Sequence, residues 1–461
     1  MVLEGTRRAL LHRLRTAQVQ GRTPSLVGAV VRDGEKVWEQ GIETDIGRQY
    51  RIGSLTKTFV AVLIMRLRDE GRLDLADPLD KHLPGTEVGS RTIAQLLSHT
   101  SGLASETPSP WWERTPGEIR PQLPDILGDD PFRHPPGRRH HYSNPGFALL
   151  GAVIGQLRGE PWGEALRKEV LEPLGMTRTS LLPEEPYARG FAVHPFADVL
   201  MPEVVQETGL MAPAGQMWST VEDLCRFATL LTKGADGVLS ADTVAEMHQP
   251  SSAPENASWE LAYGLGMQLV RVNGRMFAGH TGSMPGYLCA LWVDPEEGLG
   301  ASVMANTTSG IPIGLLAADL VSIVSTHEPK VPEPWKPLST VDPALLELTG
   351  PWFWGPTGYA LRLPASGGLD LVQLNGNVGR GTQFKRNRDG RWVGQSGYFH
   401  GEILLPVRDA SGHLSHLDLG SFVLTREPYD PSAPIPGGVP EDPWLTGEQT
   451  QRTERADQPN D

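Results

Sequence analysis

Ser54 and Lys57 stand at the start of an apolar segment, and their spacing suits nucleophilic catalysis. Residues 55–68 carry apolar side chains at helical spacing and end before Gly71, which predicts a buried helix. On its first turn the two side chains share a face, so the amine can reach the hydroxyl. A serine needs such a base, because its hydroxyl is otherwise a poor nucleophile. The pair alone is weak evidence, since serine often caps a helix.

Tyr142 and Asn144 form a second candidate group, directly before a helical pattern over residues 145–157. On a loop, two residues at this spacing present their side chains to one side. This arrangement suits a base or proton shuttle beside a group that orients a carbonyl. A simpler interpretation is that Asn144 caps the helix, with Pro145 at its first position, and that Tyr142 is a half-buried aromatic residue. Both interpretations can hold.

The third candidate group is His280-Thr281-Gly282, which is followed by Ser283 and by the apolar run 287–293. The pattern predicts an edge strand in which Gly282 lets the backbone of a ligand approach closely. It also fits a hairpin whose turn lies between residues 283 and 286. The two interpretations are compatible.

Together the three groups resemble the signature of the serine β-lactamase and penicillin-binding-protein superfamily: Ser-x-x-Lys, Tyr-x-Asn and a Lys/His-Thr-Gly strand. The segments 92–103 and 171–176 resemble the branch of the class C enzymes, DD-peptidases and related esterases, and the resemblance covers residues 20 to 325. It implies an α+β domain with an antiparallel sheet flanked by helices and an all-helical region. His280 departs from the commoner lysine, which weakens the case for β-lactam or free-carboxylate recognition.

The resemblance also implies a role for each matched residue. By this resemblance Ser54 is the nucleophile, Lys57 and Tyr142 transfer protons, and Asn144 binds the substrate amide beside His280. The backbone N–H groups of Ser54 and Ser283 would form the oxyanion hole. Thr281 and Gly282 would bind substrate. No metal or other cofactor is implied.

The group that acts as the base must have a pKa in the protein that is lower than its ordinary value. Lysine and tyrosine ordinarily titrate near 10, so burial and mutual interaction must supply roughly 4 kcal/mol to make either one basic at pH 7. Such a site must be partly buried, and the sequence leaves open whether Lys57 or Tyr142 is the base. A Ser-His-Asp triad with His280, His99 or His141 is a minor alternative, because no Gly-x-Ser-x-Gly turn is present.

Length and charge restrict the class of protein. A chain of 461 residues with 39% hydrophobic content predicts a large enzyme of two domains. The net charge of −14 opposes binding to nucleic acid or to an acidic membrane. The first 24 residues lack a secretory apolar run, so we expect a cytoplasmic protein. That location argues against a β-lactamase or cell-wall DD-peptidase, which work outside the membrane.

Closely spaced prolines divide the sequence. We predict a catalytic domain over 1–328, a stiff proline-rich linker over 329–343, a second domain over 344–432 and a disordered acidic tail over 433–461. Short alternating segments separated by Gly, Asn and Asp make the second domain a small antiparallel β-barrel. This barrel resembles the lipocalin-like domain of some superfamily members.

These features resemble one subgroup, the penicillin-binding-protein-type thioesterases that release and cyclise nonribosomal peptides. The resemblance implies that a peptidyl thioester on a peptidyl carrier protein acylates Ser54 and that the peptide's own amine then closes the ring. It also implies a preference for a D-residue at the acylating carbonyl and a contact between Arg426 and the bound peptide. The alternatives are an esterase or D-amino-acid-specific peptidase or amidase that uses water, and, less favoured, a non-catalytic binding module.

Overall fold

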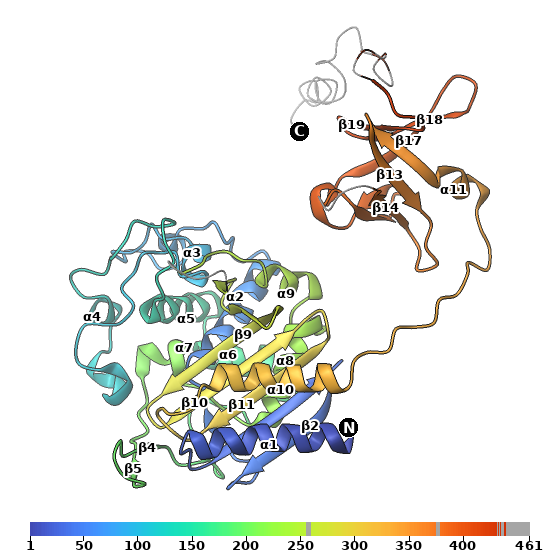
Figure 1. Cartoon of the computed structure of the whole chain (residues 1–461). Helices are drawn as coiled ribbons and strands as arrows, with labels where there is room; N and C mark the ends of the chain where they lie inside the picture. The colour runs from blue at the N-terminus through green and yellow to red at the C-terminus, as the bar shows by residue number, and fades with distance from the viewer. Residues whose placement is uncertain (255–259, 375–378, 431, 433, 435–437, 439–461) are drawn as a thin grey trace. The chain divides into compact units, whose positions relative to one another are not determined.

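The computed structural model describes residues 1–254, 260–374, 379–430, 432, 434 and 438 (Figure 1). The chain divides into two compact units, Met1–Val331 and Pro332–Asp461, and the division falls inside the proline-rich segment. All but two residues of the acidic tail predicted over 433–461 lie outside the described residues. Within the described part of the chain, no helix is both long and apolar enough to cross a membrane.

The first unit is built on a seven-stranded antiparallel sheet with strand order β2-β1-β11-β10-β9-β8-β7. Two of its hairpins have tight turns, one at Asp33-Gly34 and one at Asn273-Gly274, and each of these four residues has a positive φ. The strands are β1 (Leu26–Arg32), β2 (Glu35–Ile42), β7 (Leu261–Tyr263), β8 (Gln268–Val272), β9 (Arg275–Met284), β10 (Tyr287–Asp294) and β11 (Leu299–Ala305).

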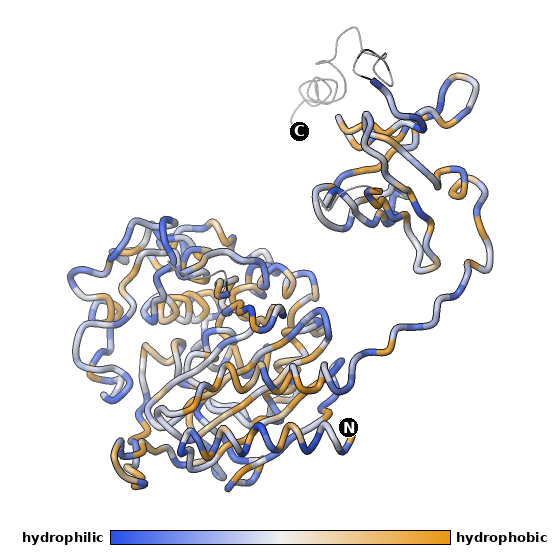
Figure 2. Tube along the Cα trace, in the orientation of Figure 1, coloured by the Kyte–Doolittle hydropathy of each residue, from blue (hydrophilic) through white to orange (hydrophobic). Residues whose placement is uncertain are grey.

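Helices cover both faces of this sheet. Along β1, Val27, Ala29 and Val31 belong to one apolar cluster, while Leu26 and Val30 belong to another. This alternation is the two-residue period of a strand that is buried on both faces. The helices α1 (Glu4–Gln20) and α10 (Ile313–His327) pack on one face, where α10 is strongly apolar (Figure 2), and α8 (Val221–Lys233) packs on the other.

A helical region lies beside the sheet, with α2 (Thr56–Asp69) buried at its centre. Phe59 of α2 stacks on Phe227 of α8, with ring centroids 3.6 Å apart, which joins the helical region to the helix on the sheet. The other helices of the region are α3 (Ile93–Leu97), α4 (Leu123–Leu127), α5 (Asn144–Arg158), α6 (Trp162–Leu166), α7 (Ala212–Gly215) and α9 (Ala241–Met247). This arrangement confirms the predicted α+β fold of the first unit.

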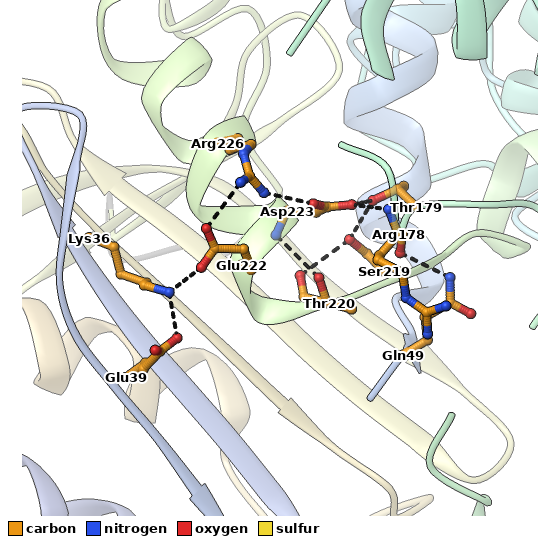
Figure 3. Close-up of polar contacts among 10 residues, drawn as sticks. All are labelled: Lys36, Glu39, Gln49, Arg178, Thr179, Ser219, Thr220, Glu222, Asp223 and Arg226. Atoms are coloured by element: carbon orange, nitrogen blue, oxygen red, sulfur yellow. Dashed lines mark hydrogen bonds and ion pairs between the residues drawn. The ribbon is translucent and has the colours of Figure 1, made fainter. Parts of the chain in front are cut away.

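Two short strand pairs complete the unit: β3 (Tyr50–Arg51) with β6 (Trp218–Ser219), and β4 (Phe191–Val193) with β5 (Leu200–Pro202). A polar network holds the first pair in place (Figure 3). Buried Asp223 accepts hydrogen bonds from the Arg178 N–H and the Thr179 hydroxyl, each at 2.8 Å. The Thr179 and Ser219 hydroxyls lie 2.8 Å apart, and Gln49 Nε2 donates to the Arg178 carbonyl at 2.9 Å. The network thus fixes the strand that leads into Ser54.

The second unit is a closed antiparallel barrel of eight strands, as predicted, and follows the short helix α11 (Pro343–Leu348). Pairing of Phe353 with Thr425 closes it, and Trp352, Tyr359 and Phe384 are buried in its core. Its strands are β12 (Gly350–Trp354), β13 (Thr357–Arg362), β14 (Leu369–Gln373), β15 (Thr382–Arg386), β16 (Trp392–Gly394), β17 (Ile403–Arg408), β18 (Leu414–Leu419) and β19 (Phe422–Thr425).

Arg426 follows the last strand of the barrel and holds that end of the chain. Its Nη1 donates to the carbonyls of Thr349 at 2.9 Å and Pro351 at 3.3 Å, and its Nη2 donates to the Glu347 carbonyl. The guanidinium carbon lies 3.9 Å from the centre of the Trp352 ring. The guanidinium is therefore engaged inside its own unit, and its contact with a bound peptide stays a prediction.

We expect Arg426→Ala to destabilise the barrel by about 2 kcal/mol, because it removes charge-assisted hydrogen bonds and a cation–π contact from a partly buried site. Calorimetry of the full chain should show the barrel's transition at a lower temperature, and Arg426→Lys should restore only part of the loss. An unchanged transition would contradict the stabilising role and leave the guanidinium free to serve a substrate.

Candidate active site

Ser54 lies in a 3-10 turn, η1 (Gly53–Leu55), that runs directly into α2. Two glycines let this turn contact β9. Gly53 has a φ of +53°, and a Cβ atom there would lie 2.6 Å from the Ser283 nitrogen. A Cβ atom on Gly282 would lie 1.8 Å from the Ile52 carbonyl oxygen. The prediction that Gly282 makes room for a ligand backbone therefore needs correction, because the chain's own Ile52 carbonyl fills that space.

The amine of Lys57 is buried next to the Ser54 hydroxyl. Its Nζ lies 3.0 Å from Ser54 Oγ and donates to the Ala214 carbonyl at 2.6 Å. Burial lowers the pKa of Lys57 to about 7, although the negative charges of Glu106 and Glu113 act to raise it. A large share of this lysine is thus neutral at physiological pH, and in that form Nζ can accept the serine proton.

Tyr142 reaches the same serine from the loop before α5. Its hydroxyl interacts with Ser54, and its ring centre lies 4.9 Å from Lys57 Nζ. Burial raises the pKa of Tyr142 above its usual value, so its hydroxyl keeps its proton at neutral pH and acts as a donor. The structure therefore brings Ser54, Lys57 and Tyr142 together.

Asn144 is the first residue of α5, and Ser143 caps the helix by accepting the Gly146 N–H at 3.1 Å. The predicted capping role of Asn144 is therefore wrong. Asn144 Nδ2 donates to Glu106 Oε1 at 2.8 Å, while Asn144 Oδ1 is buried and has no hydrogen-bond partner among the described residues. Glu106 was not singled out from the sequence, because an isolated glutamate on a loop carries no motif.

His280 lies buried on β9, and both of its ring nitrogens are engaged. Nδ1 faces the Thr281 carbonyl and therefore carries the proton, which leaves Nε2 to accept from the Tyr263 hydroxyl at 3.0 Å. Burial beside Lys57 lowers the pKa of His280 to about 3, so the ring is neutral. His280 thus places no cation where other superfamily members have a lysine.

The prediction that this motif lies on an edge strand is wrong in part. β9 lies between β10 and β8, and the predicted hairpin with β10 is present, with Met284 opposite Tyr287. Pairing with β8 ends where Gly279 meets Gln268, so the motif itself has a strand on one side only. On the other side, the Thr281 N–H and hydroxyl both donate to Gln268 Oε1 at 3.1 Å.

The remaining histidines considered as bases bond elsewhere. His99 is buried, and its Nδ1 accepts the Ser143 N–H at 3.0 Å. His141 Nε2 lies 3.1 Å from the Ser105 hydroxyl. Burial lowers the pKa of both rings. The structure therefore gives the triad no support.

A buried hub supports the carbonyl that holds Lys57. Gln216 Oε1 accepts from Arg51 Nη2 and from the Thr208 hydroxyl, each at 2.8 Å. Gln216 directly follows α7, which contains Ala214, while Arg51 lies three residues before Ser54. The hub thus links the two segments that place the nucleophile and the amine. The sequence did not indicate the role of Ala214, because this residue acts through its backbone carbonyl.

Comparisons with known proteins agree with this geometry. Residues 8–325 match the family model described as Beta-lactamase, and residues 341–426 match a domain of unknown function, DUF7586. Penicillin-binding protein 4 of Amycolatopsis lactamdurans is 29% identical over 307 residues, which cover 62% of this chain and 78% of that protein. Protein flp of Staphylococcus aureus is 26% identical over 311 residues, which cover 63% of this chain and 61% of that protein.

Solved structures give the same result. The D-stereospecific amidohydrolase from Streptomyces sp. aligns with a TM-score of 0.59 and 26% identity over 70% of this chain and 99% of that one. The structure of SurE with D-Leu aligns with a TM-score of 0.55 and 25% identity over 92% of this chain and 100% of that one. Since the Beta-lactamase model spans more than half of the sequence, the chain belongs to the β-lactamase family and has the serine-hydrolase fold of the penicillin-binding proteins.

Proposed function

We propose that this protein is a serine acyltransferase that releases a nonribosomal peptide from a carrier-protein thioester and closes it head to tail. The observation that carries the proposal is the distance of 3.0 Å between Ser54 Oγ and the buried Lys57 Nζ. A carrier-bound substrate would place the reaction in the cytoplasm, as the sequence predicts.

In the first step, neutral Lys57 takes the proton of Ser54 as Oγ attacks the thioester carbon. The backbone N–H groups of Ser54 and Ser283 would hold the developing oxyanion. The C–S bond then breaks; Tyr142 gives its proton to the leaving thiolate and takes one from protonated Lys57, so both side chains return to their neutral forms. In the second step the peptide's neutral amine attacks the ester carbon and gives up a proton to Lys57, and that proton passes to Oγ as the C–Oγ bond breaks, which regenerates Ser54.

The likeness to SurE supports a substrate with a D-residue. The aligned share of 92% is larger than Met1–Val331 alone could supply, so the likeness extends into the second unit. That structure contains D-Leu, and the Streptomyces amidohydrolase is D-stereospecific by its title. We infer that the acylating carbonyl belongs to a D-residue.

A second candidate is a D-specific amidohydrolase in which water takes the place of the amine. The 26% identity to the Streptomyces enzyme supports this candidate. The two functions share the acyl-Ser54 intermediate and differ only in the acceptor.

The products formed from a peptidyl N-acetylcysteamine thioester separate these candidates. With a D-residue at the thioester and a free N-terminal amine, we expect the cyclic peptide to be the main product by mass spectrometry, and the L-residue analogue to react more slowly. Linear acid as the main product would favour the amidohydrolase. Failure to consume either thioester faster than Ser54→Ala does would contradict both.

A further inference from the structure

A carboxylate for which no ion pair is present among the described residues, that of Glu106, lies beside the nucleophile. The partners that the described part of the chain gives to Glu106 are two neutral N–H groups: Asn144 Nδ2 at 2.8 Å from Oε1 and Trp112 Nε1 at 2.7 Å from Oε2. These donors orient the carboxylate without neutralising it, and its side chain stays exposed to solvent. The negative charge of Glu106 acts to raise the pKa of Lys57, whose amine is hydrogen-bonded to Ser54.

A second acceptor lies next to this carboxylate. Because Asn144 Nδ2 is turned toward Glu106, Oδ1 of the same amide is left buried and without a hydrogen-bond partner among the described residues. Asn144 as a whole is only 7% exposed. A buried acceptor without a donor is costly, so this oxygen indicates a ligand that donates a hydrogen bond.

The surrounding charges favour a cation over an anion. Glu113 is close enough to act on Lys57, and its own charged partners include Arg51. Arg51 is buried, and its Nη2 is bonded to Gln216 and to the Gln206 carbonyl. His280 is neutral and bonded to Tyr263 and Thr281. The two cations that act on Glu113, Lys57 and Arg51, are thus already engaged in hydrogen bonds within the chain.

We propose that Glu106 and Asn144 Oδ1 bind the ammonium group of a substrate that carries a free primary amine. An ammonium donates three hydrogen bonds, and these oxygens supply one charged and one neutral acceptor. This inference rests on the proposed function and extends it, because it selects substrates by their amine. The amine has two possible sources: the α-ammonium of the residue that acylates Ser54, or the amine that later attacks the ester.

The first arm of the test asks whether the site binds the ammonium group of the acyl donor. With the full chain, we compare kcat/KM for the p-nitrophenyl esters of D-leucine and N-acetyl-D-leucine. A charge-assisted contact at the acyl residue should give the free amine an advantage of about tenfold or more. Glu106→Gln should remove this advantage. Glu118→Gln makes the same charge change in an exposed side chain later on the same loop, and it should retain the advantage.

The second arm asks whether the site binds the amine that attacks the acyl-enzyme. Ser54 is acylated with the N-acetylated ester, D-leucinamide is added, and the ratio of aminolysis to hydrolysis is determined. If the site holds the attacking amine, Glu106→Gln should lower this ratio about tenfold. A measurement on the wild type avoids any folding defect of the variant: D-leucinamide should inhibit turnover of the acetylated ester about tenfold better than N-acetyl-D-leucinamide.

A loss in the first arm assigns the amine to the acyl donor, and a loss in the second assigns it to the acceptor. The ammonium site is overturned if acyl-Ser54 forms normally while neither ratio changes in Glu106→Gln and the two amides inhibit the wild type equally. Absence of acyl-Ser54 with both esters would instead overturn the proposed function, and the ammonium site with it.

Discussion

Ser54→Ala is expected to abolish the covalent intermediate and to lower turnover of a peptide thioester by about four orders of magnitude or more, the scale of nucleophile loss in serine hydrolases. The reason is its surroundings: Ser54 lies in the turn that leads into α2, Lys57 Nζ is 3.0 Å from its hydroxyl, and Tyr142 interacts with it. Intact-protein mass spectrometry after exposure to an activated ester or a phosphonate should show one adduct on the wild type and none on the variant.

Ser283→Ala provides the matched control for this experiment. Its side chain is exposed on β9, and its backbone nitrogen lies beside Gly53, the residue before Ser54. Only this backbone N–H is expected to act in catalysis. The variant should therefore still be labelled. An adduct that persists in Ser54→Ala, or one that is lost in Ser283→Ala, would contradict the assignment of the nucleophile.

Local patterns in the sequence were sufficient to predict most of the elements around this site. The apolar periodicity after Ser54 gave α2, the turn residues after Ser283 gave the β9–β10 hairpin, and the alternating segments after residue 344 gave the barrel. Each of these signals lies within one element and its adjoining turn, which is the range over which side-chain periodicity reports burial.

Contacts between distant segments could not be predicted in this way. The carbonyl that holds Lys57 comes from Ala214, and the oxygen that blocks Gly282 comes from Ile52; both are backbone atoms, which every residue type provides. The placement of Glu106 against Asn144 depends on how one loop folds over the start of α5. Nothing in the sequence around that glutamate distinguishes it from a solvated one.

The misassigned helix cap has a similar cause. Ser143 and Asn144 are both favourable capping residues, so propensity does not choose between them. The choice is made by tertiary contacts: buried His99 accepts the Ser143 N–H, and the Ser143 hydroxyl bonds to the Ala104 carbonyl while it caps the helix. These contacts leave Asn144 one position further on, where its amide reaches Glu106.

The rate of Ser54 acylation is expected to rise with pH and to reach a plateau, with a midpoint near 7. Lys57 must be neutral to accept the serine proton, and burial lowers its pKa to about 7. Below that value the lysine is protonated, so the rate should fall about tenfold for each unit of pH. Tyr142, whose pKa is raised, keeps its proton across this range. An N-acetylated ester excludes titration of the substrate's own amine from the measured profile.

Lys57→Ala should slow acylation of Ser54 by two or more orders of magnitude, the span typical of losing a general base, and should remove the midpoint near 7. Lys57→Met is the matched variant, because it keeps an apolar stem in the buried site while removing the amine. Tyr142→Phe should also slow acylation by about two orders of magnitude, but its profile should keep a midpoint, since Lys57 still titrates. A profile that keeps its midpoint in both lysine variants would transfer the role of base to another group. The buried ring of His99, whose centre lies 4.2 Å from that of Tyr142, would then be the first to replace.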